Sequence, residues 1–240
     1  SELLKPLLAK SEPDPPEGPL SCCVIDMPEN KGSYLITADP AGYGRSGDKS
    51  ALTVWNAVTR KEVAFWEDRE DPGRFAARLM RVQAHYNGAL LAVESNAMAC
   101  IAVLKDKKCP SLLWTNRNHP GWYATSKRIQ EAEAMLVQLL REEEIDIVSR
   151  GMLHQLINYD GNNNKRVKGQ DGTTHHFDRA RTAVMAADIL SRRHFTRANI
   201  QPEIQQRPAG QLTIGDLDRY KRKSTKEASN LFKPPPRHWM

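Results

Sequence analysis

The stretch Tyr34–Trp55, which reads YLITADPAGYGRSGDKSALTVW, most strongly limits the folds open to this chain. An apolar run ends at Asp39-Pro40, a glycine-rich turn follows, and a β-branched and aromatic run begins at Ser50. Both runs have the length of strands. Because proline biases the residue before it towards an extended conformation, the Asp39 carboxylate should lie at the end of the first strand. There it could hold a metal ion, or it could cap the turn, which is the commoner role of a single such acid.

The glycines of this loop also fit two phosphate-binding patterns. Gly42, Gly44 and Gly47 match Gly-x-Gly-x-x-Gly, but that fingerprint needs a helix to begin at the glycines, and residues 51–58 (ALTVWNAV) are β-prone. Read as a P-loop, the segment is too long, because Asp48 intervenes and would face the phosphates. A glycine-rich hairpin turn explains the same residues.

Hydrophobic periodicity and turn signals place the other elements. We expect strands at 34–38, 51–58, 61–66, 89–93, 111–115 and 145–148, and helices at 72–86, 97–107, 126–144 and from 178 onward. Residues 159–174 (YDGNNNKRVKGQDGTT) are expected to form a flexible loop or an extended hairpin. The first three strands follow one another closely, which predicts an antiparallel meander, and the strand–helix alternation after them predicts crossovers. The fold class is therefore α/β, a mixed sheet with helices on its faces.

Composition narrows the class of protein. The 240 residues allow one sizeable domain with extensions, and no apolar run approaches the roughly 18 residues of a membrane span. The acidic, proline-rich start is not a signal peptide, so we expect a soluble protein whose four cysteines are reduced in a cytosolic setting. We expect a linker at 1–31, the folded domain at 32–195 and a basic, proline-containing tail, possibly disordered, at 196–240. The net charge of +6 favours an anionic partner, nucleic acid first.

Three acids fall where the predicted topology would bring them together. Asp39 ends the first strand, Glu94 ends the strand at 89–93, which would pair parallel beside it, and Asp178 begins the last helix. Each has an ordinary explanation when taken singly: Glu94 as the point where a buried strand re-enters water, and Asp178 as an acid favoured by its helix dipole. Taken together they predict a site for divalent cations. Oxygen ligands suit Mg²⁺ or Mn²⁺, and two such ions can stabilise the attacking and leaving oxygens of a phosphodiester.

Four stretches resemble a known family in their order and spacing. They read ADPAGYGRSGDKSALTVW, LLAVESNAMA, GWYATSKRIQEAEAMLVQLLREEEIDI and HHFDRARTAVMAADIL. Together they resemble the C-terminal nuclease domain of the large terminase subunit of tailed phages, over roughly residues 32–193. The resemblance implies a ribonuclease-H-like fold, with a mixed five-stranded sheet of three antiparallel strands followed by parallel crossovers, and helices on both faces.

The resemblance also implies site residues. Asp39, Glu94 and Asp178 match the three acids that bind the catalytic metals, two ions of Mg²⁺ or Mn²⁺, and His175 matches a histidine that some relatives place near them. The last motif departs from the family, which often has a second Asp just before the catalytic one and another acid three residues after it. Phe177 and Arg181 stand there, so the site should depend more heavily on Asp178.

The implied activity is metal-dependent cleavage of concatemeric double-stranded DNA during viral genome packaging, with little sequence specificity. Cations that we expect to contact the DNA backbone lie in the glycine loop, at the start of the long helix and in the polar loop: Arg45, Lys127, Arg128, Lys165, Arg166 and Lys168. Each could instead be an ordinary solvated cation, and for Arg45 the two roles are equally matched. Trp122 is expected in the core rather than against a base.

The implied partners are an ATPase domain preceding the linker, the portal and the small terminase subunit, all in the cytoplasm of the host, with the isolated domain monomeric. Two other functions remain open from the sequence. One is a junction-resolvase or transposase-like nuclease of the same fold. The other is a motor fragment without nuclease activity, either binding nucleotide through residues 42–50 or serving only to dock.

Overall fold

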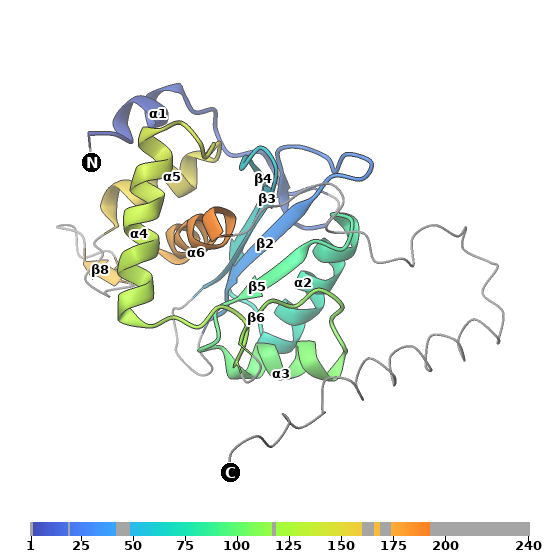
Figure 1. The fold of residues 1–240 in the computed structure, drawn as a ribbon. Coiled ribbons are helices and arrows are strands. Elements are labelled where there is room, and N and C mark those ends of the chain that lie inside the picture. The colour runs from blue at the N-terminus through green and yellow to red at the C-terminus, as the bar shows by residue number, and fades with distance from the viewer. Residues whose placement is uncertain are drawn as a thin grey trace, which may run out of the picture. The chain divides into compact units, whose positions relative to one another are not determined.

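A mixed sheet with the strand order β1-β4-β3-β2-β5 forms the centre of the described part of the chain (Figure 1). The computed structural model describes residues 2–18, 20–41, 49–116, 119–159, 166–168 and 174–192, with only the backbone of 116, 166–168 and 174–176. The strands are β1 (Cys23–Val24), β2 (Tyr34–Asp39), β3 (Ser50–Asn56), β4 (Glu62–Asp68) and β5 (Leu90–Val93). The predicted α/β class with a five-stranded mixed sheet is confirmed.

The middle of the sheet is the predicted antiparallel meander, and β5 adds parallel to it. β2 pairs with β3 and β3 with β4 in antiparallel register, while β5 runs parallel to β2 from Leu35 opposite Leu90 to Ala38 opposite Val93. The residues after the glycine loop therefore form strand β3 and not a helix. This excludes the helix-first geometry that both phosphate-binding patterns would require.

The two edges of the sheet differ from the sequence-based expectation. β1, which pairs with β4, comes from the stretch expected to be a linker, whereas residues 111–115 and 145–148 reach the sheet only through single bridges, Leu112 to Leu91 and Asp146 to Lys61. The outer edge of β5 is shared, since Leu112 pairs near its start and Trp122 pairs beside Glu94 at its end. Neither the segment around Leu112 nor the one around Trp122 forms a full strand beside β5. The chain between Leu112 and Trp122 instead forms a small ribbon of β6 (Trp114–Asn116) and β7 (His119–Pro120).

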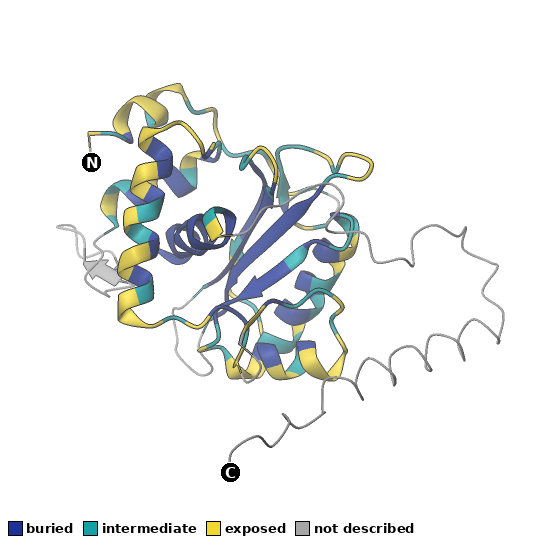
Figure 2. Ribbon diagram, in the orientation of Figure 1, coloured by how far each residue is buried: buried dark blue, intermediate teal, exposed yellow. Residues whose placement is uncertain are grey.

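Helices cover both faces of the sheet, as predicted (Figure 1). One face packs against α6 (Asp178–Arg192), which is itself covered by α4 (Ser126–Arg141) and α5 (Arg150–Asn158); the other packs against α2 (Pro72–His85) and α3 (Met98–Asp106). Because side chains alternate across a strand, Leu35 belongs to the first core and Ile36 to the second. α6 is buried from Asp178 to Leu190, on all sides rather than along one stripe (Figure 2).

Local capping explains where two of these helices begin. The Asp71 carboxylate accepts hydrogen bonds from the nitrogens of Gly73 (2.8 Å) and Arg74 (3.3 Å), with Pro72 at the first helical position, and the Thr125 hydroxyl accepts one from Arg128 (3.2 Å). Both starts were predicted. α5 was not, and neither was α1 (Lys5–Lys10), which lies in the expected linker.

The remaining described elements are a hairpin, β8 (Arg166–Lys168) with β9 (Thr174–His176), which is the extended-hairpin alternative for the polar loop. The four cysteines are free, as expected. No described helix combines the length and the apolar character that a membrane crossing needs.

Candidate metal centre

Asp39 and Glu94 lie at the same end of two neighbouring parallel strands, β2 and β5. Ala38 lies opposite Val93, and the backbone nitrogen of Glu94 donates a hydrogen bond of 2.9 Å to the carbonyl oxygen of Ala38. Each of the two acids is only 2% exposed. The topology predicted from the sequence therefore does bring these two residues to the same edge of the sheet.

The Glu94 carboxylate contacts two side chains from different elements. Its Oε1 accepts a hydrogen bond of 2.9 Å from Asn96 Nδ2, and its Oε2 lies 3.8 Å from Arg181 Nε. Arg181 belongs to the first turn of α6, so this contact brings the start of α6 against the end of β5. Asp178 is three residues before Arg181, on the same side of the helix, and is 5% exposed.

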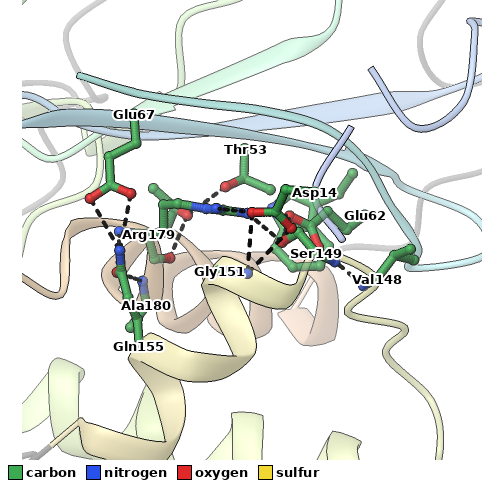
Figure 3. Close-up of polar contacts among 12 residues, drawn as sticks. Asp14, Thr53, Glu62, Glu67, Val148, Ser149, Gly151, Gln155, Arg179 and Ala180 are labelled. Atoms are coloured by element: carbon green, nitrogen blue, oxygen red, sulfur yellow. Dashed lines mark hydrogen bonds and ion pairs between the residues drawn. The ribbon is translucent and has the colours of Figure 1, made fainter. Parts of the chain in front are cut away.

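The start of α6 is held by a polar network with residues of β4, α5 and the N-terminal segment (Figure 3). Gln155 Oε1, from α5, accepts hydrogen bonds from the backbone nitrogens of Arg179 (3.0 Å) and Ala180 (3.1 Å), which are donors that a helix N-terminus leaves without intrahelical partners. Gln155 Nε2 is in turn held by both carboxylate oxygens of Glu67 on β4, at 3.1 Å each. These contacts to the next two backbone nitrogens help to hold Asp178 in position.

Arg179 anchors the same turn through its side chain. Its guanidinium, 3.1 Å from Asp14 Oδ2 and 3.6 Å from Glu62 Oε1, also donates to the Ser149 hydroxyl. Glu62 is fully buried and accepts hydrogen bonds from the nitrogens of Val148 and Ser149. Burial raises the pKa of Glu62, and the charge of Arg179 with these hydrogen bonds opposes that rise. The network is structural, since it joins β4, α5, α6 and the N-terminal segment.

A hollow adjoins the strand ends. A cavity of about 270 Å³ lies between the residue after Asp39-Pro40 and the start of α3, and its lining includes Ala41, Asn96 and Ala97. Asn96, which holds one oxygen of Glu94, is thus part of the wall. The acid end of the sheet has open space on this side.

The donors fit a hard divalent cation in kind. Carboxylate oxygens are the ligands that Mg²⁺ and Mn²⁺ prefer, and Asp39, Glu94 and Asp178 are all buried. Among the described side chains, however, no three His, Cys, Asp or Glu residues lie close enough together to hold a metal ion. The three-acid metal site stays a prediction.

Solved structures of similar fold were found among phage proteins. The large terminase nuclease of the thermophilic phage G20c matches with a TM-score of 0.54 and 15% sequence identity, over 80% of this chain and 98% of that one. The chain has the fold of a large terminase nuclease. The same phage nuclease with bound magnesium matches with a TM-score of 0.57 and 15% identity, over 77% of this chain and 95% of the other.

A second phage gives the same result. The large terminase nuclease domain of Thermus phage P74-26 matches with a TM-score of 0.55 and 16% identity, over 77% of this chain and 93% of that domain. No protein-family model and no curated protein sequence matches this chain. The ribonuclease-H-like terminase nuclease fold expected from the four sequence stretches is confirmed.

For several of the predicted site residues, the structure describes either nothing or the backbone alone. Arg45 and Lys165 are not among the described residues, and for Arg166, Lys168 and His175 only the backbone is described. In the β8–β9 hairpin His175 pairs with Val167, and the two cationic residues sit on the strand facing it. The hairpin leads directly into α6, so it places these residues next in sequence to Asp178.

The two cations predicted at the start of α4 behave differently. The Lys127 side chain is 86% exposed and lies 3.9 Å from Glu131. Arg128 instead binds inward: its guanidinium contacts Asp188 Oδ2 at 2.7 Å and stacks over Trp122, 5.0 Å from the ring centroid. Its donors are committed to the fold, which weakens its case as a DNA contact.

Trp122 is fully buried, which confirms the core assignment, and its Nε1 donates to the same Asp188 oxygen at 2.7 Å. Burial would raise the pKa of Asp188, but hydrogen bonds from Trp122 and Arg128 and the Arg128 charge outweigh it and hold that pKa below its usual value. Sequence reasoning missed Asp188, Gln155 and Asn96. Only Arg181 had been singled out, as a departure from the family pattern.

Proposed function

We propose that this chain is a metal-dependent endonuclease that hydrolyses phosphodiester bonds of double-stranded DNA in a viral genome-packaging motor. The observation that carries the proposal is the fold, shared over most of the chain with phage large terminase nucleases, one of them solved with bound magnesium. The buried acids at the ends of β2 and β5 support it, because they lie at one edge of the sheet and carboxylate oxygens are the ligands that Mg²⁺ and Mn²⁺ prefer.

Asp39, Glu94 and Asp178 would hold the divalent ions, Mg²⁺ or Mn²⁺ and two per site, with His175 beside them. Bound divalent ions lower the pKa of a water to make the nucleophile and stabilise the departing oxygen. The chain's own contribution is rigidity: β2 and β5 fix the first two acids through backbone pairing, and Gln155 with Arg179 fixes the helix turn that carries the third.

DNA would lie along cations outside the acid site. Lys127, which is highly exposed, and the residues of the glycine loop and hairpin, Arg45, Lys165, Arg166 and Lys168, are proposed to contact phosphates. Arg128 could contact a phosphate only with the nitrogen of its guanidinium that does not bind Asp188. Phosphate contacts position a duplex without reading its sequence, so cleavage should show little sequence preference and steep salt dependence.

In the motor, residues 32–195 would act as the nuclease domain, with an ATPase domain, the portal and the small terminase subunit as partners in the cytoplasm of the host cell. The isolated nuclease domain would be monomeric. The segment 196–240, which is basic, would serve DNA or another motor component.

A plasmid-nicking assay tests the proposal. Supercoiled plasmid is incubated with the protein in Mn²⁺, in Mg²⁺ and in chelator, and wild type is compared with Asp39→Asn and Asp178→Asn. The matched control is Asp106→Asn, an exposed acid at the end of α3. We expect metal-dependent nicking by wild type and the control, and a loss of at least about a hundredfold in the two site variants. Nicking that survives in both folded site variants, or that needs ATP, would contradict the assignment.

A further inference from the structure

Arg181 carries a donor that the described structure leaves without an acceptor. The residue is 6% exposed, and its Nη1 is fully buried with no hydrogen-bond partner in the described part of the chain. The neighbouring arginine on the same turn, Arg179, has both terminal nitrogens taken up by Asp14 and Ser149, and its Nε is the donor without a partner in the described part of the chain. Arg181 therefore differs from Arg179 in having an open terminal nitrogen.

Such a donor is costly. A guanidinium stays charged at any pH a protein meets, and each buried N–H without an acceptor loses the hydrogen bond it had in water. Buried polar groups in native proteins nearly always have partners, so an exception calls for a specific cause. An acceptor supplied by a ligand is one such cause.

The position of Arg181 indicates the chemistry of that ligand. Its Nε lies 3.8 Å from Glu94 Oε2, so the guanidinium is at the acid end of the sheet, within reach of the proposed reaction. A planar guanidinium can bind a carboxylate with one edge and a phosphate oxygen with the other, which a lysine ammonium cannot do with the same geometry. Its burial means that a phosphate passing over the surface would miss it, and only one entering the acid site could bind.

We propose that Arg181 binds a non-bridging oxygen of the phosphodiester that enters the site, through Nη1, while Nε stays with Glu94. Among the described residues, Arg181 is a cation that the chain itself provides at the acid site. This inference rests on the proposed function in taking DNA as the ligand. It is tested by binding without metal, so that it can fail separately from nicking.

The experiment is a fluorescence-anisotropy titration of a labelled DNA duplex in chelator, repeated over a range of salt concentrations. Arg181→Gln removes the charge, Arg181→Lys keeps it, and Arg81→Gln removes one positive charge from an exposed position on α2. Thermal unfolding of each variant shows that it is folded.

We expect Arg181→Gln to weaken binding roughly tenfold and to reduce the slope of log affinity against log salt by about 0.9, the value for one lost phosphate contact. Arg181→Lys should keep the wild-type slope but bind several-fold more weakly, because one ammonium cannot serve Glu94 and the phosphate together. Arg81→Gln should match wild type in both quantities.

A folded Arg181→Gln protein with the affinity and slope of wild type would overturn the proposal. If Arg181→Gln does not fold, Arg181→Lys decides, since wild-type affinity in that variant contradicts a shared guanidinium. A wild-type protein that does not bind duplex DNA at all overturns it as well. Nicking that fails while the Arg181 effect on binding is present would count against the proposed function alone.

Discussion

The backbone nitrogen of Glu94 donates a 2.9 Å hydrogen bond to the carbonyl oxygen of Ala38, the residue that precedes Asp39. This bond is the last rung between β2 and β5, so the relative height of the two acids is set by backbone pairing. What the backbone does not set is the orientation of the Glu94 carboxylate. That depends on Asn96 and Arg181, one on each oxygen.

Asn96→Ala should therefore lower the proposed nuclease activity with only a small loss of stability. The lost hydrogen bond to Glu94 Oε1 is worth about 1 kcal/mol, so we expect a decrease in kcat of about five- to tenfold with KM unchanged. Asn96 is exposed, so the same lost hydrogen bond should lower the thermal midpoint by no more than about 2–4 °C. The matched control is Lys107→Ala, an exposed residue just past the other end of α3. Equal kcat in Asn96→Ala and wild type would show that Asn96 does not orient the acid.

Gly121 should be the glycine that the fold can least replace. It has a φ of +85°, and a β-carbon there would lie 2.4 Å from the carbonyl oxygen of Val93, which also accepts from Trp122. Gly121→Ala thus combines a strained backbone with a clash against β5, next to Glu94. We expect a loss of about 2–5 kcal/mol in the free energy of unfolding.

Gly88→Ala separates the two effects. Gly88 has a φ of +72°, but nothing lies within 4 Å of its missing β-carbon. This variant should lose only about 1–2 kcal/mol, the cost of the left-handed backbone. Urea unfolding of both proteins gives the comparison, and equal losses would mean that the close approach to Val93 is relieved at no cost.

The sequence was informative where local signals and topology agree. The apolar runs of β2 and β5 each end in an acid, and parallel pairing then requires Asp39 and Glu94 to share an edge. β1 was missed because two residues, Cys23 and Val24, give no periodicity in a proline-rich stretch. α5 did carry a signal, with Met152, Leu153 and Leu156 at helical spacing.

The contacts that hold the site could not be predicted in the same way. Gln155 reaches the start of α6 from a helix 24 positions earlier in the chain, and Arg181 reaches Glu94 from a different element. A glutamine or an arginine on a helix is ordinarily exposed, so sequence gives no reason to pair them. Only the three-dimensional packing of α5 and α6 on the sheet does so.

Asp188→Asn should destabilise the fold in a pH-dependent manner. The Asp188 side chain is 1% exposed and binds Arg128 and Trp122, and its pKa is held below the usual value. A lowered folded-state pKa contributes stability that is present above the unfolded value, 3.8, and is lost as the pH falls through the folded value. We expect a loss of about 3 kcal/mol at pH 7 that narrows below about pH 4.

Urea unfolding at a series of pH values measures this effect. The control is Glu131→Gln, which removes an exposed acid that contacts Lys127 and Arg192 and should cost less than about 1 kcal/mol at any pH. A difference between Asp188→Asn and wild type that stays constant from pH 7 to pH 3 would show that the carboxylate charge is not what stabilises the pair.

Residues 2–31 should contribute to the stability of the folded domain, although they were expected to be a linker. Cys22 and Leu4 are buried, β1 extends the sheet along β4, and Asp14 binds both the Arg179 guanidinium (3.1 Å) and the backbone nitrogen of Gly151. A chain beginning at Gly32 would leave Arg179, 3% exposed, with Glu62 as its one remaining carboxylate partner among the described residues. We expect the thermal midpoint of this shortened chain to be several degrees lower than that of the full chain. We also expect the turn that carries Asp178 to become less rigid, because Arg179 lies in that turn.

Point variants identify the contact responsible. Asp14→Asn should lose about 1–2 kcal/mol because it removes the charge that faces Arg179, whereas Glu12→Gln, two positions away and exposed, should lose nothing measurable. Thermal and urea unfolding give both values, and plasmid nicking of Asp14→Asn shows whether the loosened turn lowers activity. A shortened chain as stable as the full one would return residues 2–31 to the role of a linker, because the buried contacts of Leu4, Cys22 and Asp14 would then contribute nothing to folding.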